Sequence, residues 1–496
     1  MKKKTKRKNK SLFIIIFLSF MIHFPFNSSV VYADFVDYSE VIEETEQMIQ
    51  DILIEKNILG LSATVVNQDE IIWAKGFGYA DLENEIKASH KTIYCIASVT
   101  KPITATAIMI LVDQGLVELD EHIINYIPQL SLKGQDYKDI KVKHLLSHSA
   151  GLKYKVSYEY LFSDTTCLLE YLKYETLLFP PGKGYNYSNI GYSLLGLIIE
   201  STSGLSFEKY INKNIFEPLA MKNSYIGMDE IIDEITAGYF TYPGLSLLES
   251  MEKFGERYAS YGLNYEDYFI IRGEGCIIKF PELDIPGGGI FSSVEDISHF
   301  LRFILSEGKT PDGVQLLSKN NINEMFLNQS SRYGLGWMLN NNNIIGHGGY
   351  FPPNNSSVKF SSEHNLGVVV MINTDNESMY QTIQSISDTI LYSFIRPHLY
   401  EIEELIFEFL SLLESSNYEK AEEIFLSSVS FPLWYRNIKN RLKENSKESS
   451  IIIADIILKE IIQSSTFRYQ VHLNIDEEDF VYIINVYGDG DNYAFY

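Results

Sequence analysis

The alternation of apolar and polar positions predicts β-strands at both ends of residues 40–395, with helices between them. Five segments have the length and the apolar or alternating pattern of strands: Leu61–Val66, Ile71–Tyr79, Asn343–His347, Ser356–Phe360 and Leu366–Asn373. The polar residues 67–70 favour a hairpin between the first two. Because strands from opposite ends of the segment enclose a helical middle, we expect an antiparallel sheet flanked by helices.

Helical patterns occupy most of the remainder of this segment. The stretch Ser98–Gln114 is apolar nearly all round, which is typical of a buried helix, and Pro102 lies in its first turn, where a missing N–H is tolerated. Residues 140–225 are mainly helical with loops. Residues 240–285 have a poor pattern and indicate an insertion near the functional site. Further helices are expected at Ser39–Lys56, Val294–Ser306 and Lys319–Leu327.

The pattern breaks near residues 395–397, which separates two parts of unequal size. Residues 398–496 predict a small α+β module, with helices near Ile402–Glu414 and Tyr418–Ser427 and strands at Phe467–Ile475 and Phe480–Tyr487. No catalytic constellation is recognisable in this module, and its role stays open. The predicted domains are therefore residues 34–397 and residues 398–496.

The N-terminus has the composition of a secretory signal peptide. Residues 2–10 contain seven Lys or Arg and no acid, and Leu12–Ile22 is apolar except for Ser19. Val31 and Ala33 supply small residues at positions −3 and −1 of a cleavage site. The apolar run is shorter than the ~20 residues of a membrane span. We therefore expect residues 1–33 to be removed and the protein to be secreted; an uncleaved segment would hold it at the cell surface.

Charge and composition exclude several classes of partner. The 496-residue chain has a formal charge of −24, which becomes −31 without the seven basic residues of 1–33. Such a surface disfavours nucleic acid and anionic membranes, and no integral membrane domain is expected after cleavage. Three cysteines are too few for a disulfide framework. His144 and His148 have the spacing of a zinc pair but no glutamate between them, so neither a metal nor a cofactor is expected.

The candidate chemistry starts with Ser98 and Lys101, at the beginning of the predicted buried helix. This Ser-x-x-Lys spacing places a hydroxyl and an amine one helical turn apart on one face. A serine hydroxyl becomes a nucleophile when a neighbouring base takes its proton, and a desolvated lysine can be that base. The same spacing recurs at Ser206–Lys209, Ser306–Lys309 and Ser356–Lys359. The surrounding sequence therefore has to distinguish Ser98 from these three.

Further motifs follow Ser98 in order along the chain. They are His144–Leu152, Pro181–Tyr192 with its Tyr187-Ser188-Asn189, Ile215–Met221, Gly287–Ser293 with Asp296, Tyr333–Trp337 and His347-Gly348-Gly349. Together with Ser98 and Lys101, this set resembles the serine β-lactamase and penicillin-binding-protein superfamily. The resemblance covers about residues 40–395 and is to the class C β-lactamase-related branch, which includes D,D-peptidases, D-aminopeptidases and esterases.

The resemblance implies a β-lactamase-like α/β (α+β) fold, in which an all-helical subdomain accompanies the antiparallel sheet. It also implies that Ser98 is acylated and that Lys101 and Tyr187 share the proton transfer, with the identity of the base left open. The residues implied to bind substrate are Asn189, His347, Gly348, Gly349 and Tyr350. The backbone N–H groups of Ser98 and Tyr350 are implied to form the oxyanion hole.

The third motif departs from that of β-lactamases, which have Lys-Thr-Gly where this chain has His347-Gly348-Gly349. A lysine there is cationic and holds the carboxylate of a β-lactam, whereas a histidine with a pKa of about 6.5 is mostly neutral at pH 7. We therefore expect a secreted serine hydrolase that acts through an acyl-enzyme on D-amino-acid peptides or esters. Residues 352–355, where relatives have a glycine-containing turn, leave the shape of the cleft floor open.

Two alternative functions remain. The altered third motif and the extra module also fit a slow-turnover sensor that binds cell-wall fragments or penicillin. A class C-type β-lactamase is the second alternative. In each case the partner is a small peptide, an ester, a β-lactam-like molecule or cell-wall peptidoglycan. The rate at which the acyl-enzyme releases its product separates these functions.

Overall fold

The computed structural model describes residues 37–155, 165–228, 231, 233–260, 269–340, 344–376 and 378–395, together with four strands between residues 451 and 495. The chain divides into Met1–Asp37 and Tyr38–Tyr496, and the second unit contains every element described below. The predicted signal peptide, the predicted domain boundary at 397 and the predicted helices Ile402–Glu414 and Tyr418–Ser427 lie outside the described residues.

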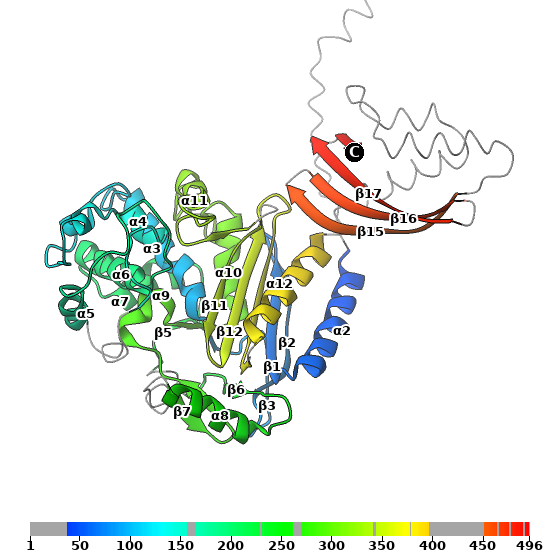
Figure 1. Cartoon of the computed structure of the whole chain (residues 1–496), viewed down its shortest axis with the longest axis horizontal. Helices are drawn as coiled ribbons and strands as arrows, with labels where there is room; N and C mark the ends of the chain where they lie inside the picture. The colour runs from blue at the N-terminus through cyan, green and yellow to red at the C-terminus, as the bar shows by residue number, and fades with distance from the viewer. Residues whose placement is uncertain are drawn as a thin grey trace, which may run out of the picture. The chain divides into compact units, whose positions relative to one another are not determined.

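A seven-stranded antiparallel sheet forms the centre of the fold (Figure 1). Its strand order is β10 (Met338–Leu339), β11 (Ile344–Phe351), β12 (Asn354–Ser361), β13 (Leu366–Ile372), β1 (Gly60–Val66), β2 (Ile71–Asp81) and β3 (Ile86–Lys87). Leu61 of β1 lies opposite Ile372 of β13 on one side and Phe77 of β2 on the other. The sheet therefore joins the two ends of residues 40–395, which confirms the predicted architecture.

Helices cover both faces of this sheet (Figure 1). α10 (Val294–Leu305) packs on one face against β1 and β13; α12 (Met379–Ile395) packs on the other against β12 and β13, with α2 (Ser39–Lys56) beside it. Every residue of β1 and β13 is buried; β13 is continuously apolar in sequence, whereas β1 also buries Ser62 and Thr64. The apolar pattern did not single out α12.

Besides α10, eight α-helices of the described residues lie between β3 and β10. The helices are α3 (Thr100–Asp113), α4 (Val142–Leu146), α5 (Thr165–Leu172), α6 (Asn189–Ser203), α7 (Phe207–Ile211), α8 (Leu247–Ser260), α9 (Ile285–Gly288) and α11 (Lys319–Met325). Shorter turns are η1 (Ala97–Val99), η2 (Ile123–Asn125), η3 (Asp136–Asp139), η5 (Asn212–Phe216) and η7 (Glu282–Asp284). Among the described residues, no single helix is long and apolar enough to span a membrane. Helix α6 and residues Phe207–Phe216 reach that length and apolarity together, but the pair is bent by 74°.

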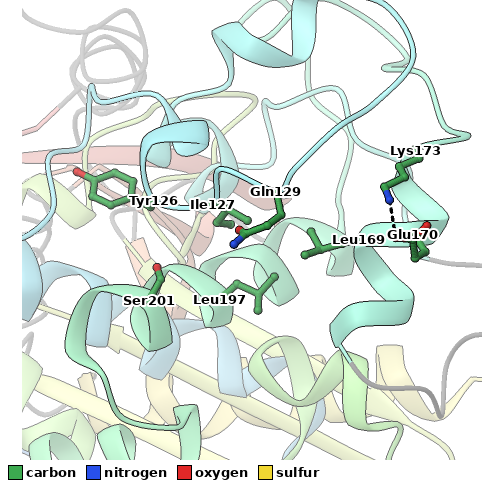
Figure 2. Close-up of a pocket in the computed structure, with 8 residues that line it drawn as sticks. All are labelled: Tyr126, Ile127, Gln129, Leu169, Glu170, Lys173, Leu197 and Ser201. Carbon is green, nitrogen blue, oxygen red and sulfur yellow. Dashed lines mark hydrogen bonds and ion pairs between the residues drawn. The ribbon is translucent and has the colours of Figure 1, made fainter.

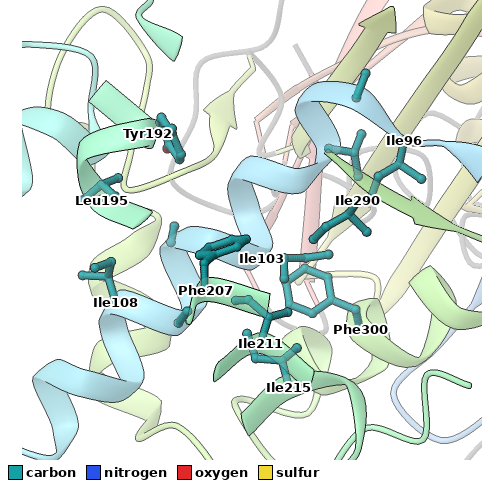
Figure 3. Close-up of a cluster of buried hydrophobic side chains, with 14 of the residues drawn as sticks. Ile96, Ile103, Ile108, Tyr192, Leu195, Phe207, Ile211, Ile215, Ile290 and Phe300 are labelled. Atoms are coloured by element: carbon teal, nitrogen blue, oxygen red, sulfur yellow. The ribbon is translucent and has the colours of Figure 1, made fainter. Parts of the chain in front are cut away.

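Helix α3 lies at the centre of this helical region because its surface is almost entirely apolar. All residues from Thr100 to Leu111 are buried. Figure 3 shows Ile103 and Ile108 of α3 in one cluster with Leu195 of α6 and Phe207 of α7. Each buried side chain of this size contributes roughly 1.5–3 kcal/mol by leaving water. This packing fixes α3 and the turn that precedes it.

Small sheets connect the remaining segments. β4 (Tyr94–Cys95) and β5 (Tyr225–Ile226) both pair with β9 (Ile290–Ser292), β6 (Tyr239–Phe240) pairs with β14 (Thr374–Asp375), and β7 (Phe269–Arg272) forms a hairpin with β8 (Gly275–Ile278). The poorly patterned residues 240–285 thus contain α8, this hairpin and η7, and they end where α9 begins.

Several boundaries differ by a few residues from the pattern-based predictions, and two of these differences lie next to the site. The helix predicted from Ser98 begins as the 3-10 turn η1 and becomes α-helical at Thr100, because Pro102 has no N–H to donate to the carbonyl of Ser98. The strand predicted to end at His347 continues to Phe351. Residues 352–353 then make the turn into β12, which begins at Asn354, two residues before the strand predicted from Ser356.

In the C-terminal part of the chain, four strands form an antiparallel sheet in sequence order. They are β15 (Ile451–Gln463), β16 (Thr466–Ile475), β17 (Glu478–Asp489) and β18 (Asn492–Phe495). The sequence pattern predicted β16 and β17 to within two residues at each end but not β15. The pairing of β15 with β16 shifts register at three places, so its apolar residues do not alternate regularly.

Candidate active site

Ser98 lies on a tight turn between β4 and α3. Ala97, directly before it, has a φ of +46°, a value that non-glycine residues adopt only where their surroundings impose it. The neighbouring Ile96 is held on two sides: its N–H donates to the carbonyl of Ile290 at 3.1 Å, and its carbonyl accepts from the Ser356 hydroxyl at 2.7 Å. The Ser98 hydroxyl is thus presented from a turn anchored to two strands and a buried helix.

Lys101 lies one turn further along and is fully buried. Its Nζ is 3.1 Å from Ser98 Oγ, 2.9 Å from Asn189 Oδ1 and 2.7 Å from the carbonyl oxygen of Gly287. Three acceptors match the three protons of an ammonium. Burial nevertheless penalises the charge and lowers the pKa of Lys101 to about 7, against the opposing attraction of Asp284. Both forms of this amine are therefore populated near neutral pH.

Tyr187 contacts both residues. Its hydroxyl interacts with Ser98, and Lys101 Nζ lies 4.8 Å from the centre of its ring, within the range of a cation–π contact. Burial raises the pKa of Tyr187 well above its ordinary value, and the interaction with Ser98 offsets this only in part. The phenol therefore keeps its proton at neutral pH, and Lys101 loses its proton more readily than Tyr187 does.

Asn189 begins α6 and faces Lys101. The Ser188 hydroxyl caps this helix by accepting from the N–H of Gly191 at 3.1 Å, which fixes the first turn. The two ends of the Asn189 amide have different partners, because Oδ1 accepts from Lys101 while Nδ2 donates to Asp284 Oδ2 at 3.4 Å. The structure thus brings Ser98, Lys101 and the predicted Tyr-x-Asn motif together.

His347 is buried, and both of its ring nitrogens have partners. Nδ1 is 2.8 Å from the carbonyl oxygen of Gly348, and Nε2 is 2.9 Å from the hydroxyl of Tyr333. Since a carbonyl only accepts, Nδ1 carries the proton and Nε2 accepts from Tyr333. Burial, with a smaller contribution from the charge of Lys101, lowers the pKa of His347 to about 3. The ring is therefore neutral, and its bonding capacity is used within the protein.

The two glycines after His347 let β11 run between packed neighbours. A Cβ added at Gly349 would lie 2.2 Å from the carbonyl oxygen of Ile96 and 2.2 Å from Ser356 Oγ, so a side chain there would displace the Ser98 turn. Gly348 faces the other side of the strand, towards α12. Tyr350 follows and is 46% exposed. The third motif therefore lies directly alongside the turn that carries the nucleophile candidate.

The sequence patterns did not assign Asp284, His148 or Tyr333 to this site. The ring of His148 lies 4.1 Å from that of Tyr187, its Nδ1 accepts from the N–H of Ser188 at 3.0 Å, and burial lowers its pKa well below the ordinary value. His148 and Tyr333 occur within motifs that carried the family resemblance. The available signal for Asp284 was an acidic residue just before the glycines of 287–289.

The other Ser-x-x-Lys pairs have different partners. Ser206 caps α7 by accepting from the N–H of Lys209, the Ser306 hydroxyl donates to a carbonyl on the turn after β1, and Lys359 pairs with Asp388 at 2.5 Å. The histidines with zinc-like spacing also face apart. His144 Nδ1 accepts from a backbone N–H, and the described part of the chain contains no group of three or more His, Cys, Asp or Glu placed to hold a metal.

Aromatic side chains lie on both sides of the Ser98 turn. The rings of Phe280 and Phe351 are 4.8 Å apart, and Phe280 Cζ would be 2.6 Å from a Cβ at Gly288, next to the turn. On the helical side, the ring of Tyr154 lies 6.1 Å from that of Tyr187, and Tyr154 is 51% exposed. The surroundings of Ser98 therefore offer apolar and aromatic surface to a substrate.

A pocket of about 510 Å³ lies elsewhere, between the residues after η2 and helices α5 and α6 (Figure 2). Its lining residues are Tyr126, Ile127, Gln129, Leu169, Glu170, Lys173, Leu197 and Ser201. Glu170 and Lys173 pair with each other, and the lining includes none of the residues that surround Ser98. This pocket is therefore separate from the residues that surround Ser98.

An antiparallel sheet covered by helices, with Ser98 and Lys101 at the start of a buried helix beside it, is the architecture of the β-lactamase-like fold. The Beta-lactamase family model matches residues 45–388. The chain therefore belongs to the Beta-lactamase family, whose members are serine hydrolases.

Individual relatives are distant. The chain is 25% identical over 360 residues to "Protein flp" of Staphylococcus aureus (strain N315), an alignment that covers 70% of this chain but only 66% of that protein, slightly less than two thirds of its length. It is 24% identical over 367 residues to "Penicillin-binding protein 4*" of Bacillus subtilis (strain 168), covering 70% and 75% of the two chains. The structure of a beta-lactamase/D-alanine carboxypeptidase from Pseudomonas syringae superposes with a TM-score of 0.58 at 18% identity, covering 71% and 99%.

Proposed function

We propose that this protein is a serine hydrolase that forms an acyl-enzyme at Ser98. The 3.1 Å contact between Ser98 Oγ and Lys101 Nζ carries the proposal. General-base catalysis is most effective when the pKa of the base lies near the operating pH, and burial brings the pKa of Lys101 to about 7. Tyr187, whose hydroxyl interacts with Ser98, completes the set of groups that can move the proton.

In the first step, Ser98 Oγ attacks the carbonyl carbon of the substrate while the hydroxyl proton passes to the neutral Lys101 amine. The backbone N–H groups of Ser98 and Tyr350 stabilise the negative charge that develops on the carbonyl oxygen. The bond to the leaving group then breaks, and the leaving group takes the proton from Lys101, directly or through the Tyr187 hydroxyl. Water attacks the resulting ester, releases the acid and restores the proton to Ser98 Oγ.

The substrates that we propose are D-amino-acid peptides or esters, ahead of β-lactams. The neutral, buried His347 replaces the cation that would hold a β-lactam carboxylate. Asn189, Gly348, Gly349 and Tyr350 would line the bound substrate. The similarity to a protein named for penicillin binding supports a cell-wall peptide as the partner.

We also propose that residues 1–33 direct export and are then removed, so that the enzyme acts outside the membrane. The basic segment, the short apolar run and the small residues before the cleavage point support this location. The N-terminal residue of the protein recovered from the culture medium of an expressing cell tests it, and Asp34 is expected. Recovery of the uncleaved chain only in the cell pellet would contradict export.

The chemistry is tested by intact-protein mass spectrometry of residues 34–496 after exposure to p-nitrophenyl acetate, a D-alanyl-D-alanine peptide, a fluorescent penicillin and a chromogenic cephalosporin. We expect a transient adduct and multiple turnovers with the ester or the peptide, and no adduct in Ser98→Ala. No adduct with any compound, or an adduct that persists in Ser98→Ala, would overturn the proposal. A penicillin adduct that never turns over would favour the slow-turnover sensor, and rapid cephalosporin hydrolysis would favour a β-lactamase.

A further inference from the structure

We propose that Asp284 is a positioning residue for the acylation of Ser98: its carboxylate orients the Asn189 amide and holds charge opposite Lys101. This inference rests on the proposed function, because it concerns the base of the same reaction. Asp284 lies in η7 and is 8% exposed. None of the motifs identified in the sequence includes this turn.

The segment that carries Asp284 is fixed to both helices of the site. The carbonyl of Leu283 accepts from the Ser193 hydroxyl of α6 at 2.6 Å, and the carbonyl of Pro286 accepts from the Thr104 hydroxyl of α3 at 2.7 Å. Gly287, one residue later, accepts from Lys101 Nζ. Because α6 carries Asn189 and α3 carries Lys101, residues 283–287 hold Asp284 at a defined place between the two.

The hydrogen bond from Asn189 Nδ2 to Asp284 Oδ2 decides which way the amide points. An ionised carboxylate only accepts, so the end of the amide that faces Asp284 is the NH₂ group. The amide oxygen then faces Lys101 Nζ at 2.9 Å. Without the carboxylate, nothing at that end requires an NH₂ group, and the amide can turn its donor towards the amine.

The charge of Asp284 acts on Lys101 without strong competition. Burial raises the pKa of Asp284, while the charge of Lys101, the hydrogen bond from Asn189 and the charge of Lys155 oppose this effect and favour the ionised carboxylate. The other titratable groups beside Lys101 are Tyr187, Tyr192, His148 and His347. Burial raises the pKa values of these tyrosines and lowers those of these histidines, so all four are uncharged near neutral pH. Among the described residues, Asp284 is the acidic group that opposes the desolvation of Lys101.

The carboxylate of Asp284 affects how strong a base the Lys101 amine is. Burial alone would push the pKa of Lys101 further down and leave an amine that accepts the Ser98 proton poorly. Asp284 favours the protonated amine and so keeps Lys101 a sufficiently strong base. Removing the charge while keeping the shape should therefore make Lys101 lose its proton at lower pH and become a weaker base.

The test compares Asp284→Asn, Asp284→Ser and Asp284→Glu with wild type as residues 34–496, and labels Ser98 with a fluorophosphonate across pH 5 to 9. Both Asn and Ser remove the charge, so the acid limb of the labelling rate should move to lower pH by about half a pH unit or more in whichever variant folds. The plateau should fall about 10-fold for Asn and further for Ser, which is too short to hold the amide. The Glu variant keeps the charge and should retain the wild-type limb.

Asp296→Asn is the matched control, because Asp296 is also a buried carboxylate but binds Ser224 and the N–H of Asn223 on the far side of β9. Its limb should coincide with that of wild type. If the wild type is labelled and the acid limb of the labelling rate does not move in Asp284→Asn or Asp284→Ser, the role of Asp284 is overturned and the proposed function stands. No labelling of the wild type at any pH would overturn the proposed function itself.

Discussion

The amine of Lys101 has three hydrogen-bond acceptors within 3.1 Å and no contact with solvent. The acceptors and Asp284 favour the charged amine, desolvation favours the neutral one, and desolvation is the larger effect. A lysine on the surface has a pKa of about 10.4 and stays protonated near neutral pH. At the scale of the single residue, burial therefore decides whether the amine beside Ser98 can act as a base.

The rate at which a fluorophosphonate labels Ser98 should rise with pH through about 7, since the neutral amine is the reactive form and its fraction grows as Lys101 loses its proton. Lys101→Arg keeps the charge and cannot deprotonate in this range, so labelling at pH 8 should fall about 100-fold or more. Quenched-flow labelling followed by mass spectrometry measures both effects. Equal rates at pH 6 and pH 8 in the wild type would contradict the role of Lys101 as base.

His347 should affect the pH dependence of stability. Its pKa is about 3 in the folded protein, against about 6.5 in the unfolded chain, so the unfolded chain binds more protons between these values. The free energy of unfolding therefore decreases as the pH falls below 6.5, with a share from this ring of up to about 1.4 kcal/mol per pH unit.

His347→Gln keeps an acceptor for the Tyr333 hydroxyl and removes the titrating group. The decrease in unfolding free energy between pH 6.5 and pH 4.5, obtained from urea denaturation, should be smaller in this variant than in the wild type. The comparison of the two proteins cancels the contributions of the buried carboxylates, which both retain. Identical pH slopes would show that the ring is not held neutral.

At the scale of the element, β11 connects the sheet to the site. β10 pairs only with Ile345 and Gly346, and the Ser98 turn contacts β11 beyond that pairing. Gly349 permits this contact, because its hydrogen atom faces the carbonyl of Ile96 where a methyl group would collide. The spacing between the strand and the nucleophile candidate therefore depends on one missing side chain.

Gly349→Ala should lower the free energy of unfolding by about 1–3 kcal/mol and the labelling rate of Ser98 about 10-fold or more, because the added methyl displaces the turn. Gly191→Ala is a matched substitution in α6, where the nearest atom to the added Cβ is 3.6 Å away. It should leave stability unchanged or slightly increased. Thermal denaturation and labelling report the two quantities, and a Gly349→Ala protein with wild-type labelling would show that the turn does not rest on β11.

At the scale of the whole molecule, the central sheet forms only when β1, near the start of residues 60–372, pairs with β13, at their end. β1 lies between β2 and β13, so strands distant in sequence are direct neighbours. α12 then covers β12 and β13 and ends at Ile395. All predicted site residues and the helices that hold them fall within residues 38–395.

A chain of residues 34–397 should therefore fold and become labelled at Ser98 at a rate within about twofold of the chain that includes residues 398–496. Fluorophosphonate labelling and the far-ultraviolet circular dichroism spectrum of both proteins provide the measurement. A shortened chain that folds but does not react would place part of the reactive site, or its support, in the C-terminal module.

Most of the central sheet was predictable because its strands have either an apolar run, as in β13, or an alternating pattern, as in β1. The helix α12 and the short strands β4, β5 and β9 were not, since two- or three-residue strands have no measurable period. Ser98, Lys101, Tyr187 and Asn189 could be proposed from motif order alone. Asp284 could not, because an isolated acid in a loop looks the same in sequence whether it is solvated or buried.

The sequence by itself determined which chemical groups are present and their order: a serine and a lysine one helical turn apart, a later Tyr-x-Asn and a His-Gly-Gly. It thereby determined the family. The tertiary structure alone decided the charges these groups carry, because a pKa depends on desolvation and on neighbours brought from distant positions. Folding buries Lys101 against Asn189 and Gly287 near Asp284, and it buries His347 against Tyr333. The first becomes an amine that titrates near neutral pH, and the second becomes a ring that is neutral near pH 7.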